Sequence, residues 1–161
     1  MQILPLSGNH ERADFDCGNP VLNDWLCKVA RQHQHKGLSK TFVAVLEAAP
    51  ETICGYYALT LSEIDGRELP TRLRRKLPRR IPGVRLGRLA VARQHHGKRL
   101  GELLLMDALA RAELVYREAG GIGLFVDALD VEVAGYYRRF GFQPAPDNPL
   151  LLFLPAAIFR G

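Results

Sequence analysis

The stretch "ARQHHGKRLGELLLMDAL", Ala92–Leu109, changes within a few residues from polar and basic to the pattern of an amphipathic helix. Gly97, Lys98 and Arg99 stand where that helix is expected to begin. The first turn of an α-helix carries backbone N–H groups without intrahelical partners, so it attracts negative charge. A basic helix start that contains glycine therefore predicts a binding site for an anion, most often a phosphate.

Alternating strands and helices are predicted on both sides of this stretch. The preceding "VRLGRLAVA", 84–92, predicts a strand that runs directly into the loop, and Gly120 and Gly121 are expected to end the helix. One apolar stripe runs along the helix: Gly101, Leu104, Leu105, Ala108, Leu109, Ala112, Val115 and Tyr116. Further on, "IGLFVDAL" predicts a buried strand, "DVEVAGYYRRFG" a short helix that Asp130 caps and Gly141 ends, and "LLLFLPAAIF", 150–159, a closing strand.

The first half of the chain predicts three strands and one helix. The strands are "MQILPL", "TFVAVLEA" and "TICGYYALTLSEI", and the helix covers 17–37, with Asn19 as its cap and Gly37 as its end. Three prolines interrupt 69–83, which can hold at most one short helix. The order of these elements predicts one α+β or α/β domain over residues 1–161, with a mixed sheet.

Length and composition are those of a folded single domain. The chain has 161 residues, of which 47% are hydrophobic and 24% charged. It shows no apolar run of the ~20 residues that a membrane span needs and no signal peptide, so we expect a cytosolic protein without a membrane partner. Cys17, Cys27 and Cys54 lie far apart, which argues against a disulfide framework and a zinc site.

Basic residues are concentrated in one window. The net charge is +5, yet 67–88 holds nine basic residues against the single acid Glu68, so this window alone is +8. Such a patch indicates a polyanionic partner, and a solvated loop is the alternative that composition leaves open.

The stretches "VRLGRLAV", "ARQHHGKRLG", "GLFVDAL" and "YYRRFGF" together resemble the GNAT superfamily of acetyl-CoA-dependent N-acetyltransferases. The resemblance implies an α/β three-layer sandwich with a mixed central sheet, in which the strands predicted at 84–91 and 122–129 splay apart. "FDCGNPVLNDWL", "GYYAL" and the arginines before "GRLAV" resemble the tRNA-acetylating toxins of type II toxin–antitoxin systems. That branch implies acetylation of the amino group of an aminoacyl-tRNA, a ribbon-helix-helix antitoxin as partner, and a homodimer.

The resemblance assigns the cofactor acetyl-CoA to the loop and the strand before it. The pyrophosphate would bind His96, Gly97, Lys98, Arg99, Leu100 and Gly101, and the pantetheine arm the N–H groups of Leu89, Ala90 and Val91, one of which would stabilise the oxyanion. The chain departs from the family where Arg99 replaces a glycine and His96 a glutamine or arginine. Either the Arg99 guanidinium adds charge for the diphosphate, or it distorts the loop and weakens binding.

Tyr137 matches the family's tyrosine that protonates the departing CoA thiolate. Tyr136 and Tyr137 are adjacent, so on a helix they point about 100° apart, and only Tyr137 shares a face with Val133, Ala134 and Phe140. A phenol with a pKa of about 10 can donate to a thiolate whose thiol has a pKa of about 8.5. Core packing of both rings is the alternative interpretation.

The remaining candidates concern the acceptor. Residues expected to hold the tRNA acceptor stem are Arg72, Arg74, Arg75, Lys76, Arg79, Arg80, Arg85 and Arg88. Glu63, Asp65 and Asp127 are possible general bases that nothing distinguishes from surface carboxylates, and no metal is expected at the histidines. Two alternatives stay open: a GNAT enzyme for a small-molecule or protein amine, and a degenerate GNAT domain that binds CoA or a partner without turnover.

Overall fold

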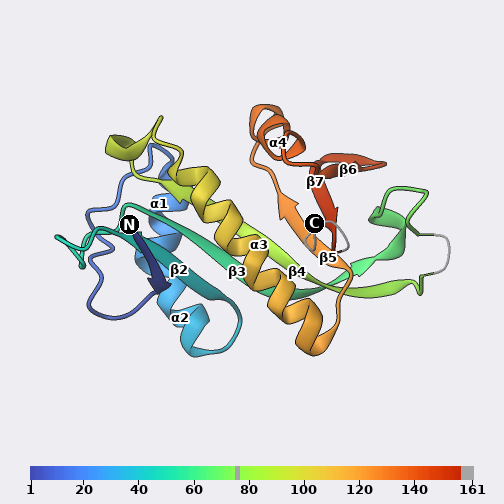
Figure 1. Ribbon diagram of the computed structural model, residues 1–161, viewed down its shortest axis with the longest axis horizontal. Coiled ribbons are helices and arrows are strands. Elements are labelled where there is room, and N and C mark those ends of the chain that lie inside the picture. The colour runs from blue at the N-terminus through green and yellow to red at the C-terminus, as the bar shows by residue number, and fades with distance from the viewer. Residues whose placement is uncertain (75–76, 157–161) are drawn as a thin grey trace. The chain divides into compact units, whose positions relative to one another are not determined.

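A computed structural model describes residues 1–74 and 77–156, which form a mixed sheet with helices (Figure 1). The elements are β1 (Gln2–Pro5), α1 (Pro20–Lys28), α2 (Ala30–His35), β2 (Lys40–Val45), β3 (Gly55–Asp65), the 3₁₀ turn η1 (Gly66–Glu68), β4 (Arg80–Val91), the 3₁₀ turn η2 (Arg93–His95), α3 (Leu100–Ala119), β5 (Gly123–Asp127), α4 (Val131–Arg138), β6 (Gln143–Ala145) and β7 (Asn148–Pro155). The strands are hydrogen-bonded in the order β1-β2-β3-β4-β5-β7-β6. The pair β4–β5 is parallel and β1–β2, β2–β3, β5–β7 and β6–β7 are antiparallel, which confirms the predicted mixed sheet.

The chain divides into two compact units, and β3, β4 and α3 contribute residues to both. The first unit comprises Met1–Thr60 and Gly87–Ala108, and the second Leu61–Leu86 and the chain from Leu109 onward. Among the described residues, no helix is long and apolar enough to span a membrane.

The first unit encloses a core built around Tyr56. Its buried residues are Leu6, Phe15, Leu22, Leu26, Ala30, Val43, Val45, Ile53, Tyr56, Ala90 and Ala92. Asn19 caps α1, as predicted, because its side chain accepts hydrogen bonds from the N–H groups of Val21 and Leu22. The single helix predicted for 17–37 is wrong in one respect. Val29 has φ −120°, outside the helical range, and it divides the segment into α1 and α2.

The second unit has its core where β5 meets β7. The rings of Phe125 and Phe153 lie 4.7 Å apart and pack with Ile64, Leu69 and Ile81. Gly83 is required beside them, since a Cβ at this position would lie 2.6 Å from the Phe125 ring. The parallel register joins Val84–Leu86 to Leu124–Val126, only three of the twelve residues of β4.

The predicted cap and end of α4 are confirmed, and three strand predictions are corrected. β4 begins at Arg80, four residues before the predicted start at 84, so it extends into the proline-interrupted segment 69–83 where at most a short helix was expected. The Asp130 side chain accepts a hydrogen bond from Val133 N at 2.8 Å and so caps α4, and Gly141 follows with φ +94°. The sequence did not predict β6, which pairs with β7. The predicted closing strand is β7, and its last predicted residues, 157–159, lie outside the described residues.

Helix α3 carries the predicted apolar stripe. Leu104, Leu105, Ala108 and Ala112 are buried on it, and the helix ends before Gly120, which has φ +94°. In the first unit the stripe covers β3, because a Cβ at Gly55 would lie 2.9 Å from the Leu104 side chain. This packing fixes the start of α3 relative to the strands of that unit.

Candidate active site

The loop between β4 and α3 is held at its start by backbone and side-chain hydrogen bonds. Ala92 N donates to Cys54 O at 2.8 Å, which attaches the end of β4 to the residue preceding β3. His96 Nε2 lies 2.7 Å from the carbonyl oxygen of Val91, to which it donates. The imidazole therefore closes the loop back onto the strand.

The last residues of this loop adopt a backbone suited to glycine. Gly97 has φ +75°, and Arg99, with φ +61°, is the one non-glycine residue with positive φ in the described part of the chain. A left-handed conformation costs a residue with a Cβ about 1–2 kcal/mol. Arg99 therefore adopts, at an energetic cost, a backbone conformation that favours glycine. Strain of this kind is common at functional sites.

The start of α3 is open to an anion. Residues 96–99 are exposed, and the first intrahelical bond runs from Leu103 N to Arg99 O at 3.1 Å. Lysine and arginine side chains carry only donors, so Lys98 and Arg99 cannot cap the N–H groups of Leu100 and Gly101. Two N–H groups without a recorded partner among the described residues thus coincide with two cations at one helix end, an arrangement suited to a phosphate.

The predicted strand residues differ in the direction of their N–H groups. Ala92 N bonds toward Cys54, and the carbonyl of Ala90 also faces this side, 3.0 Å from a Cβ built on Gly55. Backbone groups alternate along a strand, so the N–H groups of Leu89 and Val91 point to the opposite edge of β4. Leu89 and Val91 are half-buried, whereas Ala90 is buried.

Residues 15–23, part of the "FDCGNPVLNDWL" motif, contact the same loop. Arg93 N donates to Asp16 O at 2.9 Å, and the Arg93 guanidinium lies 3.5 Å from the Asp16 carboxylate. Hydrogen bonds from Gly18 N and the Asn23 amide, with the charge of Arg93, hold the pKa of Asp16 below its usual value. A Cβ at Gly18 would lie 3.3 Å from Arg93 Nε, so glycine leaves room for the arginine. Sequence reasoning missed this contact.

Tyr137 lies in the second unit, buried on α4. It is 5% exposed, and its ring packs edge-on against Phe142 at 5.6 Å. Burial, with a smaller effect of Tyr136, raises the pKa of Tyr137 well above its usual value, so its phenol stays protonated. Tyr136 is half-buried, and its ring packs edge-on against Tyr137 at 5.6 Å and against Phe140 at 5.1 Å. Because Phe140 packs against Tyr136, the expectation that Phe140 shares a face with Tyr137 and not with Tyr136 is wrong.

The structure separates the predicted RNA-binding residues into groups. Arg72 and Arg74 are exposed, and Arg75 and Lys76 lie outside the described residues. The other four make internal contacts: Arg79 with Asp65 at 3.8 Å, Arg80 with Glu63 at 3.2 Å, Arg85 with Asp127, and Arg88 with the Trp25 ring at 4.7 Å.

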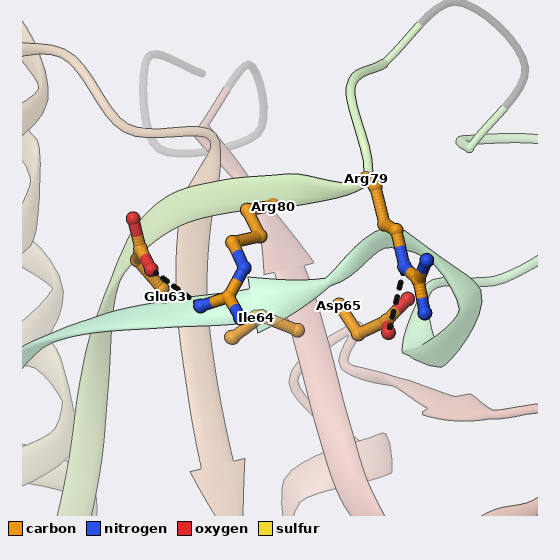
Figure 2. A pocket seen from close by; sticks show the side chains of 5 residues that line it. All are labelled: Glu63, Ile64, Asp65, Arg79 and Arg80. Carbon is orange, nitrogen blue, oxygen red and sulfur yellow. Dashed lines mark hydrogen bonds and ion pairs between the residues drawn. The ribbon is translucent and has the colours of Figure 1, made fainter.

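Two of these ion pairs line a pocket of 440 Å³ in the second unit. Figure 2 shows Glu63 with Arg80 on one side of Ile64, and Asp65 with Arg79 on the other. Hydrogen bonds from Arg67 hold the pKa of Asp65 below its usual value. All three candidate bases, Asp127 included, are thus paired with arginine.

The histidines and cysteines are candidate metal ligands by residue type. Within the described ranges, no group of three or more His, Cys, Asp or Glu side chains could hold a metal ion. His96 contacts the Val91 carbonyl, and the Trp25 ring packs edge-on against His33 at 6.0 Å.

Comparison with known families and relatives gives a consistent result. The model of the acetyltransferase (GNAT) domain matches residues 38–144. A tRNA-acetylating toxin of Mycobacterium tuberculosis is 34% identical over 149 residues, which are 92% of this chain and 88% of the relative. A probable toxin TacT of Sinorhizobium fredii is 32% identical, over 98% of this chain and 92% of its own.

Solved structures share the fold over nearly the whole chain, each matching 99% of it. A KacT mutant with a tyrosine changed to phenylalanine has a TM-score of 0.92 at 27% identity, with 96% of its chain matched. AtaT complexed with acetyl-methionyl-tRNAfMet has a TM-score of 0.90 at 30% identity, with 96% of its chain matched. A tyrosine-to-phenylalanine mutant of AtaT, bound to the C-terminus of the antitoxin AtaR and to acetyl-CoA, has a TM-score of 0.82 at 29% identity. Of its chain, 95% is matched.

Proposed function

The chain belongs to the GNAT acetyltransferase family, and from this premise we propose that it moves the acetyl group of acetyl-CoA to the α-amino group of an aminoacyl-tRNA. Relatives that resemble it over most of their length are a tRNA-acetylating toxin and AtaT, which was solved with acetyl-methionyl-tRNAfMet. The enzyme would thereby act as a toxin, in the cytoplasm where charged tRNA is found.

The open start of α3 is the observation that carries this proposal. Its N–H donors at Leu100 and Gly101 and the cations of Lys98 and Arg99 fit the diphosphate of acetyl-CoA in charge and in hydrogen-bonding type. The cofactor supplies an activated acetyl thioester. Residues His96–Gly101 hold its diphosphate, and the His96–Val91 contact keeps this loop in place.

The strand and the tyrosine serve the chemistry. The outward N–H groups of Leu89 and Val91 bind the carrier's amide arm, and one donates to the thioester oxygen as negative charge develops on it. The amine nitrogen bonds to the acetyl carbon, and Tyr137 gives its phenolic proton to the CoA sulfur when the carbon–sulfur bond breaks. The nitrogen sheds one proton to water, and the phenolate takes one back from water, so the phenol is restored. The raised pKa of Tyr137 keeps its proton available. An α-amine with a pKa of about 7.7–8.0 is partly neutral at pH 7, so it needs no strong base.

The arginine-rich segment binds the acceptor through phosphates. Exposed Arg72 and Arg74 have no carboxylate contact within the described residues, so their charge is not reduced. Arg75 and Lys76, which follow in the sequence, add two formal charges. Arg79 and Arg80 must exchange their carboxylate partners for phosphates. Such exposed pairs contribute less than about 1 kcal/mol, so that exchange is feasible. Activity should decrease steeply with salt.

A toxin requires a partner that silences it. We propose a small antitoxin with a ribbon-helix-helix DNA-binding domain, whose tail covers the active site, and a homodimeric enzyme. One similar structure contains the C-terminus of an antitoxin. Co-purification with the product of an adjacent small gene, and light scattering of the purified enzyme, test these two points.

Labelled acetyl-CoA with total charged tRNA tests the function. We expect label on the aminoacyl group of one or a few tRNAs, released as N-acetyl amino acid by mild alkali. Deacylated tRNA should accept none, and Tyr137→Phe should transfer far more slowly. Label on free amines or protein lysines, and none on charged tRNA, would identify another acceptor. Absence of CoA release with every acceptor would indicate a binding domain without turnover.

A further inference from the structure

Arg88 differs from its arginine neighbours in what it contacts. Its guanidinium carbon lies 4.7 Å from the centre of the Trp25 ring, and the side chain is half-buried between β4 and α1 in the first unit. Its one hydrogen bond within the described residues is a long contact of 3.4 Å from Nη1 to the carbonyl of Gly87. No carboxylate among the described residues lies within ion-pair distance of it.

Four other arginines of the basic window have carboxylate partners. Arg67 and Arg79 pair with Asp65, and Arg80 pairs with Glu63. Arg85 pairs with Asp127 and lies 3.4 Å from the Ser62 hydroxyl. Carboxylates of the same chain partly cancel these charges, whereas no carboxylate among the described residues cancels the charge of Arg88.

Arg88 is also left with an unused buried donor. Its Nε is buried and has no hydrogen-bond partner in the described part of the chain. A guanidinium has five N–H donors, and an unpaired buried donor or charge is unfavourable because water no longer solvates it. An arginine in this state is explained if an anion supplies the missing acceptors during function.

The Trp25 ring gives this arginine a fixed orientation. It stacks on Tyr56 at 6.1 Å with an interplanar angle of 9°, and the Tyr56 hydroxyl donates to Leu22 O at 2.7 Å. The rings of Phe15 and Tyr56 pack edge-on with their centres 5.5 Å apart. Trp25, Leu22 and Phe15 all belong to "FDCGNPVLNDWL", so part of this motif serves to hold the Arg88 guanidinium as a flat, preoriented fork.

We infer that Arg88 on Trp25 binds a phosphodiester at the single-stranded 3′ end of the acceptor, close to the esterified amino acid. The inference rests on the proposed function, since Arg88 directly precedes Leu89, one of the two residues whose N–H groups we assign to the acetyl carrier. A bidentate guanidinium matches two phosphate oxygens. Arg72 and Arg74 would add general attraction, and Arg88 would fix the terminal nucleotide where the amine reacts.

The test compares two acceptors that carry the same aminoacyl group. One is the aminoacyl-tRNA that accepts label, and the other is that amino acid esterified to adenosine, which has no phosphodiester. For Arg88→Gln we expect kcat/KM with the tRNA to fall about 10- to 100-fold and to stay within about twofold with the aminoacyl-adenosine. The slope of log(kcat/KM) against log salt should become shallower by about 0.7, the value for one contact to single-stranded RNA.

Matched variants make the result specific. Arg117→Gln removes an equal charge from an exposed site on α3. It should change neither kcat/KM with either acceptor nor the slope of log(kcat/KM) against log salt. Arg88→Lys keeps the charge and loses the planar fork. Its kcat/KM should therefore fall several-fold with the aminoacyl-tRNA and stay unchanged with the aminoacyl-adenosine. Because a lysine preserves most of the packing, it decides the question if Arg88→Gln fails to fold.

Three outcomes would overturn the inference. An equal loss with both acceptors assigns Arg88 to the integrity of the catalytic strand. Full activity with both excludes it from binding. Full activity combined with lost inhibition by the antitoxin assigns it to a protein partner. Failure of the proposed function is seen separately, because the unmodified enzyme would then label no charged tRNA at all.

Discussion

Two strands of this chain lead into helices, and the two helix starts have opposite chemistry. After β5, Asp130 caps α4 through its own carboxylate, with Glu132 in the first turn. After β4, the residues before α3 are Lys98 and Arg99, which cannot accept a hydrogen bond. Helix α4 satisfies one N-terminal donor, Val133 N, with a side chain of its own chain, whereas we propose that the N-terminal donors of α3 bind an external anion.

The difference indicates that topology alone does not make an anion site. Both helices follow buried strands, and both carry a glutamate in the first turn. Only the start of α3 combines positive-φ residues, Gly97 and Arg99, with exposed cations. The strained Arg99 indicates that this open end is maintained at a cost in stability.

Giving α3 a carboxylate like that of α4 should have the largest effect on the cofactor. Arg99→Asp replaces a cation by an anion where the diphosphate binds. We expect the KM for acetyl-CoA to rise about 100-fold, or about 2.8 kcal/mol. Steady-state kinetics measure it, with Arg117→Asp as the control of equal charge change. An unchanged KM would mean that the diphosphate binds elsewhere.

Tyr137→Phe tests what the closed helix α4 contributes. Loss of the proton donor should lower kcat about 100- to 1000-fold and leave the KM for acetyl-CoA unchanged. Tyr136→Phe is the matched variant on the neighbouring residue and should retain most activity. If the two variants lose activity equally, neither hydroxyl is the specific donor.

The pH profile follows from the raised pKa of Tyr137. Below the pKa of the acceptor amine, about 7.7–8.0, kcat/KM should fall about tenfold per pH unit as the amine becomes protonated. A tyrosine donor works while protonated, and its pKa lies above the usual value. The profile should therefore stay flat up to about pH 10, the ordinary pKa of tyrosine. A decrease between pH 8 and 9.5 would contradict the buried, protonated phenol.

Arg99→Gly separates charge from strain at the open helix start. Glycine adopts φ +61° without cost, so the free energy of unfolding should rise by about 1 kcal/mol. The KM for acetyl-CoA should rise about 3- to 10-fold because one cation is lost. Denaturant titration and kinetics give the two values. A lower KM would show that the arginine obstructs the diphosphate.

The smallest effect is expected at the closed helix start. Asp130→Ala removes the cap of α4 and should reduce the free energy of unfolding by about 1 kcal/mol. The KM for acetyl-CoA should not change. A large rise in that KM would mean that the start of α4 also binds the cofactor.

Local signals explain what the sequence predicted. The periodicity of α3, the caps at Asn19 and Asp130, and the terminating glycines depend on residues a few positions apart, and all were confirmed. The break at Val29 escaped prediction because the helical periodicity continues through it. β6 escaped because three residues that include a proline give little strand signal.

Pairings distant in sequence could not be predicted. Asp16 contacts Arg93, Trp25 contacts Arg88, and Arg85 contacts Asp127. Charge counting treated the arginines of the basic window as equivalent, whereas the fold gives some of them carboxylates and gives one an aromatic ring. The positive φ of Arg99 was likewise not predicted, although its position in the loop was.

The most direct test of the account is a calorimetric titration of the enzyme with coenzyme A and, in parallel, with pantetheine, which has the thiol arm but no diphosphate. If the start of α3 holds the diphosphate, coenzyme A should bind and pantetheine should bind at least about 100-fold more weakly. Equal affinities, or no heat with coenzyme A at millimolar concentration, would contradict it.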